Sequence, residues 1–467
     1  MKYLVMLLLA LFLLQNFTAV LACTTVIVGK NRSTDGSVLV IHNEDLGENA
    51  AHKVVINKRQ QWKPGDKLQL FNGTNINQSQ QSFRFVATSI FEKSFYPGDY
   101  TFGVNENKLA ATNNTAYLRG IKTYEESVAY KNPGGIIWTE LTQLALERGV
   151  TARDTVKMLG ALVEQYGLSG DSATMMAIAD AEEGWWMEIA GPGQWAAKRV
   201  GDNEAIMRAN AFRIAEIDFH DSANWLFSAK IVDYAKEKGW YSGGAFSFKD
   251  AYTEPERNNG KFNVLRQQRL DALLAQKSKI SISDLAAMMR DVYAGTEYYI
   301  TDANGSPFHN EYYTIANMET EISAMVALNA KKMPQSLCMW TCMANPATGI
   351  YLPFHLQDTS VAAWYSQASA VYKNNSAYWQ FTELARLSDL KYSSLQPAIA
   401  ADWQQYEQQF MQQCRINEKA VEALYQAGDT DAAAEMLTAF DADCAKITRK
   451  ELGKLLSKVK TEVYWQE

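Results

Sequence analysis

The chain is poor in cysteine and histidine, with 5 of each among its 467 residues. The five histidines do not show the spacing of metal ligands, so the sequence predicts no metal and no cofactor. The G-x-S-x-G, H-E-x-x-H, Walker and C-x-x-C motifs are also absent. The familiar signatures of serine hydrolases, zinc peptidases and nucleotide-binding proteins are therefore missing, and any catalytic chemistry has to come from other residues.

Basic residues are fewer than acidic ones, with 45 Lys and Arg against 52 Asp and Glu, and long apolar runs are scarce. The formal net charge is -7 at pH 7, and this acidity argues against nucleic acid as a partner. After residue 22, no apolar stretch approaches the roughly 20 residues that span a bilayer. The hydrophobic content of 47% is enough for a large core, so the sequence predicts a globular protein without a membrane span.

The one long apolar run stands at the start of the chain. Residues 1–22 begin with Lys2, continue through "YLVMLLLALFLL" and end in "TAVLA", where Val20 and Ala22 occupy the small-residue positions of a cleavage site. This pattern is typical of a secretory signal peptide. We therefore expect a secreted or periplasmic protein whose mature chain begins at Cys23.

Cys23 allows two further interpretations beside a buried structural thiol. "VLAC" is a tolerable lipobox, so Cys23 could be acylated and the protein could be a lipid-anchored surface protein that binds a ligand. However, no polar tether follows the cysteine, because "TTVIVGK" enters a strand at once. As the first residue of a mature chain, Cys23 would instead carry a thiol beside a free α-amine that can act as a base, which favours a catalytic nucleophile.

Strand signals dominate the first part of the chain. "TTVIVGK" and "SVLVIHN" flank "NRSTDG", in which Asp35 and Gly36 favour the turn of an antiparallel hairpin. Further strands are expected within 52–58, 83–91 and 101–113, with a polar loop at 72–81 between the first two.

Helical periodicity follows at 134–149 and 151–167, and Thr151 with Asp154 forms a candidate cap of the second helix. Residues 173–191 return to strand periodicity with a turn at Glu183 and Gly184. From about Gln396 the chain is almost wholly helical, in two segments broken at "QAGDTD". The sequence predicts an α+β protein with a catalytic domain at 23–395 and a helical hairpin at 396–467 packed on it.

Several segments together resemble one known family. They are "CTTVIVGK", "STDGSVLVIHNED", "GVNENKLAATNN", "MRANAFRI", "FNVLRQQR" and "WTCMANPATGIYLPF". In this order they are similar to the bacterial cysteine dipeptidases of N-terminal-nucleophile type, relatives of the secernins, over nearly all of residues 23–467. The resemblance implies the four-layer αββα sandwich that this group shares with conjugated bile acid hydrolases and penicillin V acylases.

The resemblance also implies roles for single residues. Cys23 matches the nucleophile, and Asp45 matches the carboxylate that orients the nucleophile and its amine. Asn210 corresponds to the amide that binds the oxyanion, with Asn114 or its neighbour Asn113 as its partner. Arg266 resembles a guanidinium near the thiol, where its charge favours the thiolate.

The sequence departs from the family at one position, because His42 stands where relatives usually have an arginine before Asn-Glu-Asp. A histidine is neutral over much of the working pH range, so either Arg266 suffices or activity is weaker or more dependent on pH.

The expected activity is the hydrolysis of dipeptides through a thioester on Cys23, without a cofactor. An acylase that cleaves an N-acyl or bile-acid amide is the alternative within the same chemistry. The substrate is a dipeptide or a small amide in either case, and the sequence indicates no oligomeric state.

Four further cysteines could pair in an oxidising compartment. Cys414 and Cys444 lie at similar distances from the break between the two C-terminal helical segments, so we predict a disulfide between them, with two buried free thiols as the alternative. Cys338 and Cys342 can bond only if "CMWTC" is helical or tightly turned.

Overall fold

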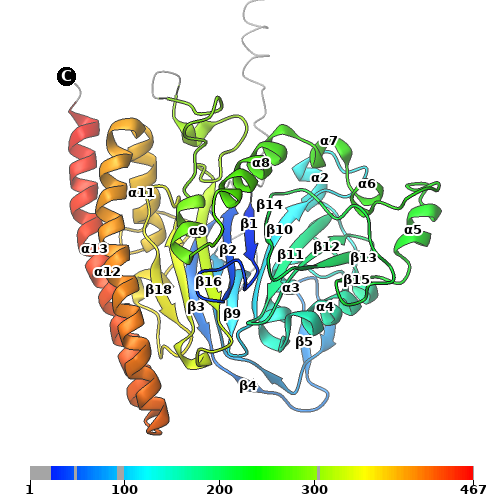
Figure 1. Cartoon of the computed structure of the whole chain (residues 1–467), viewed down its shortest axis with the longest axis horizontal. Helices are drawn as coiled ribbons and strands as arrows, with labels where there is room; N and C mark the ends of the chain where they lie inside the picture. Colours follow the sequence, from blue (N-terminus) through cyan, green and yellow to red (C-terminus); the bar gives the residue numbers. More distant parts are fainter. Residues whose placement is uncertain (1–22, 47–49, 92–98, 302–304, 466–467) are drawn as a thin grey trace, which may run out of the picture.

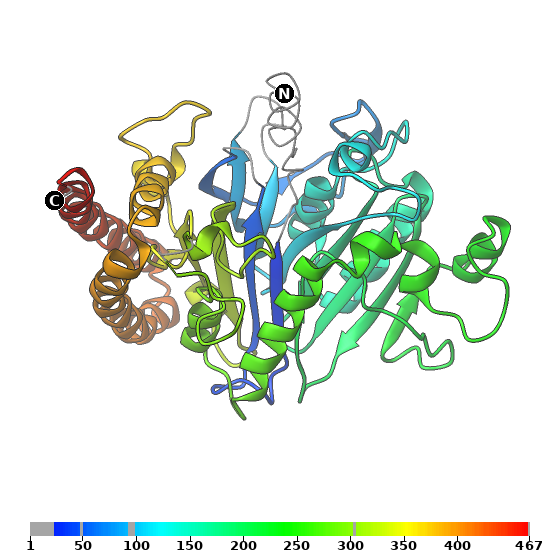
Figure 2. The same ribbon diagram turned by 90° about the horizontal axis from the view of Figure 1, so that it is seen from above.

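The computed structural model of the chain describes residues 23–46, 50–91, 99–301 and 305–465. The expected signal peptide at 1–22 lies outside the described residues. The described residues form two large antiparallel sheets of six and eight strands that pack face to face, with helices on their outer faces (Figure 1 and Figure 2). The α+β class expected from the sequence is confirmed.

The described chain begins inside the six-stranded sheet, at β1, which lies between β14 and β2. β1 and β2 form the predicted antiparallel hairpin, with Thr25 opposite His42 and Gly36 at a φ of 79° in the turn, a conformation that favours glycine. β16, from late in the chain, pairs with the other edge of β2. In spatial order the strands are β14 (Ala205–Arg208), β1 (Thr24–Val28), β2 (Val38–Asp45), β16 (Thr320–Leu328), β17 (Cys338–Met343) and β18 (Leu352–His355).

The eight-stranded sheet contains the other predicted strands. The segment 101–113, expected to be one strand, contains nearly all of one strand and most of the next, joined by a turn. The predicted hairpin at Glu183 and Gly184 is present. In spatial order the strands are β15 (Trp225–Phe227), β13 (Gln194–Val200), β12 (Gly184–Ala190), β11 (Ala173–Ala179), β10 (Ala110–Ala116), β9 (Tyr100–Asn105), β8 (Phe85–Phe91) and β3 (Ala51–Asn57).

The polar segment 72–81, expected to be a loop, contains short strands. These strands, β6 and the start of β7, pair with β5 and β4, which precede the segment, and form two small ribbons of mostly exposed residues. Their bounds are β4 (Gln60–Gln61), β5 (Lys67–Gln69), β6 (Asn75–Asn77) and β7 (Gln81–Ser82).

Helices α3 (Trp138–Arg148) and α4 (Ala152–Tyr166) cover the outer face of the eight-stranded sheet. The side chain of Thr151 accepts a hydrogen bond from the main-chain N–H of Asp154, as the sequence predicts. Side chains alternate across the strands beneath, so that Met176 packs under these helices while Met175 faces the core between the sheets. The order of layers is therefore helix, sheet, sheet, helix.

The helices on the outer side of the six-stranded sheet include α8 (Lys261–Ala275) and α9 (Ile282–Met288). Shorter helices connect the larger elements. They are α2 (Tyr124–Val128), α5 (Ile231–Glu237), α6 (Phe248–Tyr252), α7 (Pro255–Asn258) and α10 (Ala363–Ser366), with 3-10 turns η2 (Pro307–His309) and η3 (Pro334–Ser336).

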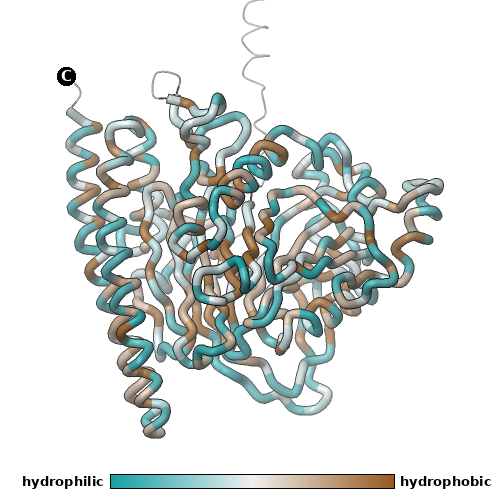
Figure 3. The backbone as a smooth tube through the Cα atoms, viewed as in Figure 1, coloured by the Kyte–Doolittle hydropathy of each residue, from teal (hydrophilic) through white to brown (hydrophobic). Residues whose placement is uncertain are grey.

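α11 (Ala377–Asp389), α12 (Tyr392–Gln426) and α13 (Thr430–Tyr464) follow, and the last two form a long antiparallel hairpin beside β18 (Figure 1). Figure 3 shows hydrophilic and hydrophobic residues mixed along this hairpin, and the buried residues of each helix are mostly three or four positions apart, as on one face of a helix. Among the described helices, none combines the length and apolar character needed to cross a membrane. The division at residue 395 remains a prediction.

The predicted disulfide between Cys414 and Cys444 is wrong, because all five cysteines are free thiols. The spacing along two helices gives the position of a side chain along the helix axis but not the direction in which it points. The thiol of Cys414 points toward His355. Cys338 and Cys342 lie on one extended strand, β17, which holds their Cα atoms about 13 Å apart and too far for a bond.

Candidate active site

Cys23 lies immediately before β1 and is only 1% exposed. Its side chain is on the inner face of the six-stranded sheet, between the two sheets. The thiol donates a hydrogen bond to Oε1 of Glu44 over 3.3 Å, and the main-chain oxygen of Asp45 lies 3.9 Å from the sulfur. The β1–β2 pairing brings these residues together, since Thr24 lies opposite Asn43 in the hairpin.

A chain of buried polar contacts leads from the thiol into the space between the sheets. Glu44 Oε2 is 2.9 Å from Nε2 of His42, and Nδ1 of His42 is 2.8 Å from the hydroxyl of Thr25. Thr25 in turn donates to Oδ1 of Asn114 on β10 over 2.5 Å. His42 and Glu44 share this face because alternate residues of a strand point the same way.

Asp45 points to the opposite face of β2, toward the outer layer. Its Oδ2 accepts a hydrogen bond of 2.9 Å from the side-chain amide of Asn317, whereas its Oδ1 is buried without a hydrogen-bond partner among the described residues. Burial raises the pKa of Asp45, and hydrogen bonds from Thr320 and Asn317 and the charge of Arg266 act against that rise. A buried carboxylate oxygen without a donor is costly and is free to accept one.

Arg266 connects Cys23 with Asn210. It is completely buried on α8, where Nη1 donates to the carbonyl oxygen of Cys23 over 2.9 Å and Nη2 donates to Oδ1 of Asn210 over 3.0 Å. Asn263, one turn before it on α8, also accepts from Nη2 and bonds the main chain of Asn210. The guanidinium thus contacts the main chain of Cys23 instead of its sulfur.

The two asparagines of "TNN" point in opposite directions, which decides between the two candidates that the family motif leaves open. Asn113 donates to the hydroxyl of Thr142 on α3, in the outer helix layer. Asn114 faces the six-stranded sheet, and its amide nitrogen lies 3.3 Å from the carbonyl oxygen of Cys23. Asn114 is therefore the one that lies beside Cys23.

The electrostatic surroundings keep the Cys23 thiol protonated in this arrangement. Burial raises its pKa well above the ordinary value, and the carboxylates of Glu44 and Asp45 raise it further. The charge of Arg266 acts in the expected direction, because its attraction to an ionised Cys23 is one of the interactions that raise the pKa of Arg266, but burial and the two carboxylates outweigh it at the thiol.

Five residues expected from the sequence, namely Cys23, Asp45, Asn114, Asn210 and Arg266, are gathered in one place. Sequence reasoning missed Glu44 and Asn317, which contact the thiol and Asp45. Glu44 could have been found, because its position opposite Cys23 follows from the hairpin register. Asn317 carries no local signal, since it lies in a loop before β16.

In the described residues, two groups of side chains that include both cysteine and histidine could hold a metal ion. Their positions in the sequence do not have the spacing of a metal-binding motif. Cys23, His42 and Glu44 form one group, and Cys338, His355 and Cys414 form the other; in each, the potential ligand atoms lie within 4.8 Å of one another. The fold brings these residues together from different strands and helices.

Comparison with known proteins identifies the family of this chain. Residues 22–405 match the model of "Peptidase family C69". A probable dipeptidase of Salmonella dublin is 26% identical over 361 residues, which cover 72% of this chain and 81% of the relative. A probable dipeptidase A of Streptococcus pyogenes serotype M3 (strain SSI-1) is 24% identical, covering 88% and 91%.

The similarity of this chain to solved structures is weaker than its match to the family. Penicillin V acylase of Agrobacterium tumefaciens aligns with a TM-score of 0.36 and 13% identity, covering 71% of this chain and 86% of that one. A mutant of conjugated bile acid hydrolase from Clostridium perfringens aligns with a TM-score of 0.33 and 10% identity, covering 76% and 98%. Scores this low do not by themselves establish a common fold, but the family match spans most of the sequence, and the chain belongs to peptidase family C69.

Proposed function

We propose that this protein is an exported cysteine dipeptidase of N-terminal-nucleophile type, in which the thiol of Cys23 attacks the peptide bond. The observation that supports this most directly is the gathering of Asp45, Asn114, Asn210 and Arg266 around Cys23. The names of the relatives, probable dipeptidases, support the substrate class.

In the proposed mechanism the base is the α-amine that cleavage before Cys23 creates. The raised pKa of the thiol means that a base must take its proton, and an α-amine has a pKa of about 7.7 to 8.0. Oδ1 of Asp45, which has no partner among the described residues, is available to accept a hydrogen bond from this amine and hold it in place.

The reaction then proceeds in two halves. The α-amine takes the proton of the thiol, and the sulfur attacks the carbonyl carbon of the peptide. The α-ammonium returns that proton to the leaving amine, and a thioester remains. Water, deprotonated by the α-amine, then attacks the thioester, releases the carboxylic acid and restores the thiol.

Asn210 is the better candidate for binding the oxyanion. The amide nitrogen of Asn114 already has three main-chain oxygens within 3.4 Å, those of Cys23, Arg208 and Ala209. The amide nitrogen of Asn210 has one within the described part of the chain, that of Thr115 at 3.0 Å, and an amide nitrogen carries two hydrogens. The second hydrogen can donate to the oxyanion, a contribution of roughly 3 kcal/mol. Asn114 and Arg266 act as positioning residues through the carbonyl of Cys23.

The test compares Cys23→Ser with the wild type in dipeptide hydrolysis. We expect kcat/KM to fall about a thousandfold or more, while Cys342→Ser, which alters a buried thiol on β17, retains activity. Circular dichroism checks that both variants fold. Retained dipeptide hydrolysis in a folded Cys23→Ser protein would contradict the nucleophile, and a wild type that cleaves acyl amides but not dipeptides would be an acylase.

The intact mass of the mature wild-type protein tests the processing step. We expect a chain that begins at unmodified Cys23. A diacylglycerol thioether on Cys23 would block the sulfur that has to attack the substrate and would instead support a lipid-anchored binding protein.

A further inference from the structure

A second group of thiols and imidazole lies at the far edge of the six-stranded sheet. Cys338 on β17 and His355 on β18 are direct partners in the antiparallel pairing. Cys414 reaches the same place from α12, with its sulfur 3.6 Å from Nε2 of His355. Three elements separated in sequence thus converge on one point.

The distances within this group fit a tetrahedral metal site. With Zn–S bonds of about 2.3 Å and Zn–N bonds of about 2.0–2.1 Å, tetrahedral angles place a sulfur and a nitrogen ligand about 3.6 Å apart. The observed separation of 3.6 Å between Cys414 and His355 has this value. All three potential ligand atoms lie within 4.8 Å of one another, so the ligands need little rearrangement to coordinate one ion.

The imidazole of His355 is oriented as metal-binding histidines usually are. Nδ1 lies 2.9 Å and 3.0 Å from the two carboxylate oxygens of Asp441 on α13, so it carries a hydrogen and leaves Nε2 as a ligand. The main-chain N–H of His355 also donates to Asp441 over 2.7 Å. A carboxylate behind the imidazole in this way fixes its tautomer and its direction.

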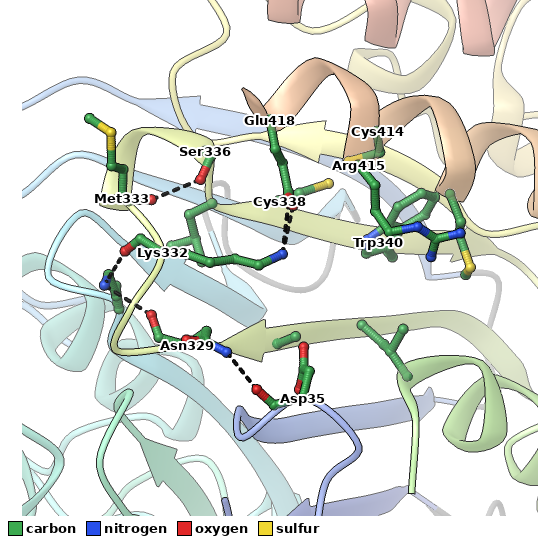
Figure 4. A pocket seen from close by; sticks show the side chains of 15 residues that line it. Asp35, Asn329, Lys332, Met333, Ser336, Cys338, Trp340, Cys414, Arg415 and Glu418 are labelled. Carbon is green, nitrogen blue, oxygen red and sulfur yellow. Dashed lines mark hydrogen bonds and ion pairs between the residues drawn. The ribbon is translucent and has the colours of Figure 1, made fainter. Parts of the chain in front are cut away.

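One side of the group opens to a cavity. Cys338 and Cys414 line a cavity of about 140 Å³, together with Trp340 and Met411. Figure 4 shows Cys338 on its strand beneath the helix that carries Cys414 and Glu418. Glu418 is paired with Lys332, 2.8 Å away, and the cavity has room for a water molecule as a fourth ligand.

We propose that Cys338, His355 and Cys414 bind a thiophilic divalent cation of the zinc type, with water from the cavity as the fourth ligand. Two thiolates balance the charge of the ion, and two sulfurs with one imidazole suit zinc rather than magnesium or calcium. The ion joins α12 to β17 and β18, and so stabilises the attachment of the C-terminal hairpin. This site is separate from Cys23 and does not depend on the proposed peptidase mechanism.

The experiment uses the full-length protein, reduced and freed of metal, and titrates it with Co²⁺. We expect the sulfur-to-cobalt charge-transfer band and the intense visible bands of tetrahedral cobalt to saturate at one equivalent. Zn²⁺ should displace the cobalt and raise Tm, because a ligand that binds the folded state stabilises it.

One variant and two controls define the site. Cys338→Ser alters a half-buried side chain at the cavity and should lose the charge-transfer band and the rise in Tm. Cys444→Ser, on the adjacent helix, and Cys23→Ser, in the other group, should retain both effects. Absence of the band in reduced wild type, or its persistence in Cys338→Ser, would overturn the proposal. A disulfide between Cys338 and Cys414 in the purified protein, with no cobalt binding after reduction, would also overturn it and identify a redox pair.

Discussion

Glu44 and His42 form the immediate surroundings of the Cys23 thiol. Glu44 accepts the hydrogen bond of the thiol with one oxygen and contacts His42 with the other. Its negative charge is one of the causes that raise the pKa of Cys23. His42 therefore reaches the thiol through a carboxylate.

Replacing Glu44 by Gln should lower the pKa of the Cys23 thiol, because the change removes a nearby negative charge while preserving the size of the side chain. The measurement is the rate of thiol alkylation at Cys23 as a function of pH, with the modified site identified by mass spectrometry. The midpoint should move to lower pH than in wild type.

Glu435→Gln is the matched control, since Glu435 is exposed on α13 and should leave the midpoint unchanged. An unaltered midpoint in Glu44→Gln would mean that the charge of Glu44 does not contribute to the raised pKa of this thiol.

The C-terminal hairpin is attached to the rest of the molecule by polar contacts as well as apolar ones. Glu407 on α12 accepts the main-chain N–H of Tyr351 over 2.8 Å and forms an ion pair with Arg290. The indole of Trp403, also on α12, donates to the carbonyl oxygen of Thr348 over 3.0 Å. These contacts fix how the helix lies against the segment before β18.

Glu407→Ala should destabilise the protein by roughly 3 kcal/mol, because it removes the carboxylate partner of the largely buried Arg290 and the acceptor of the N–H of Tyr351. Urea unfolding measures the loss as a lower midpoint. Glu418→Ala, which breaks the more exposed pair with Lys332, should cost less than about 1 kcal/mol. Equal losses in the two variants would show that the burial of Glu407 contributes nothing.

Local patterns made several elements predictable. The turn at Asp35 and Gly36 identifies the β1–β2 hairpin, and Thr151 identifies the start of α4. Contacts between distant elements were not predictable in this way. No local signal relates Asn317 to Asp45 or Cys414 to His355, and helical spacing alone led to the wrong disulfide. The site residues could be named because they lie in motifs shared with a family, whereas their mutual contacts depend on the packing of two sheets.

Considered as a whole, the molecule buries several carboxyl groups that are more easily protonated when it is folded. Burial raises the pKa of Asp171 and of Glu188 to about 7, and that of Glu321 to about 8. Each group binds a proton in the folded state over a pH range in which the unfolded state has lost it. Their contribution to stability is therefore greatest at low pH and declines as the pH rises through these values. His52 acts in the opposite direction, since burial lowers its pKa to about 4, but its effect is confined to pH values below about 6.5.

The free energy of unfolding should therefore decrease between about pH 6.5 and pH 8, where His52 no longer contributes. Chemical denaturation at fixed ionic strength across this range measures the slope. Glu321→Gln removes one of the titrating groups while preserving an acceptor for the hydroxyl of Tyr378, and it should flatten the decrease. A wild type whose stability rises over this range would contradict the expected direction.

The order of strands in the six-stranded sheet sets when the site can exist during synthesis. β1 and β2 are made first, but β2 acquires its second neighbour only when β16 is translated, and Asn317, which holds Asp45, precedes that strand directly. A ribosome-bound chain that has not yet reached this point carries the cysteine without its completed surroundings. The topology thus delays completion of the contacts around Cys23 and Asp45 until most of the polypeptide has been made.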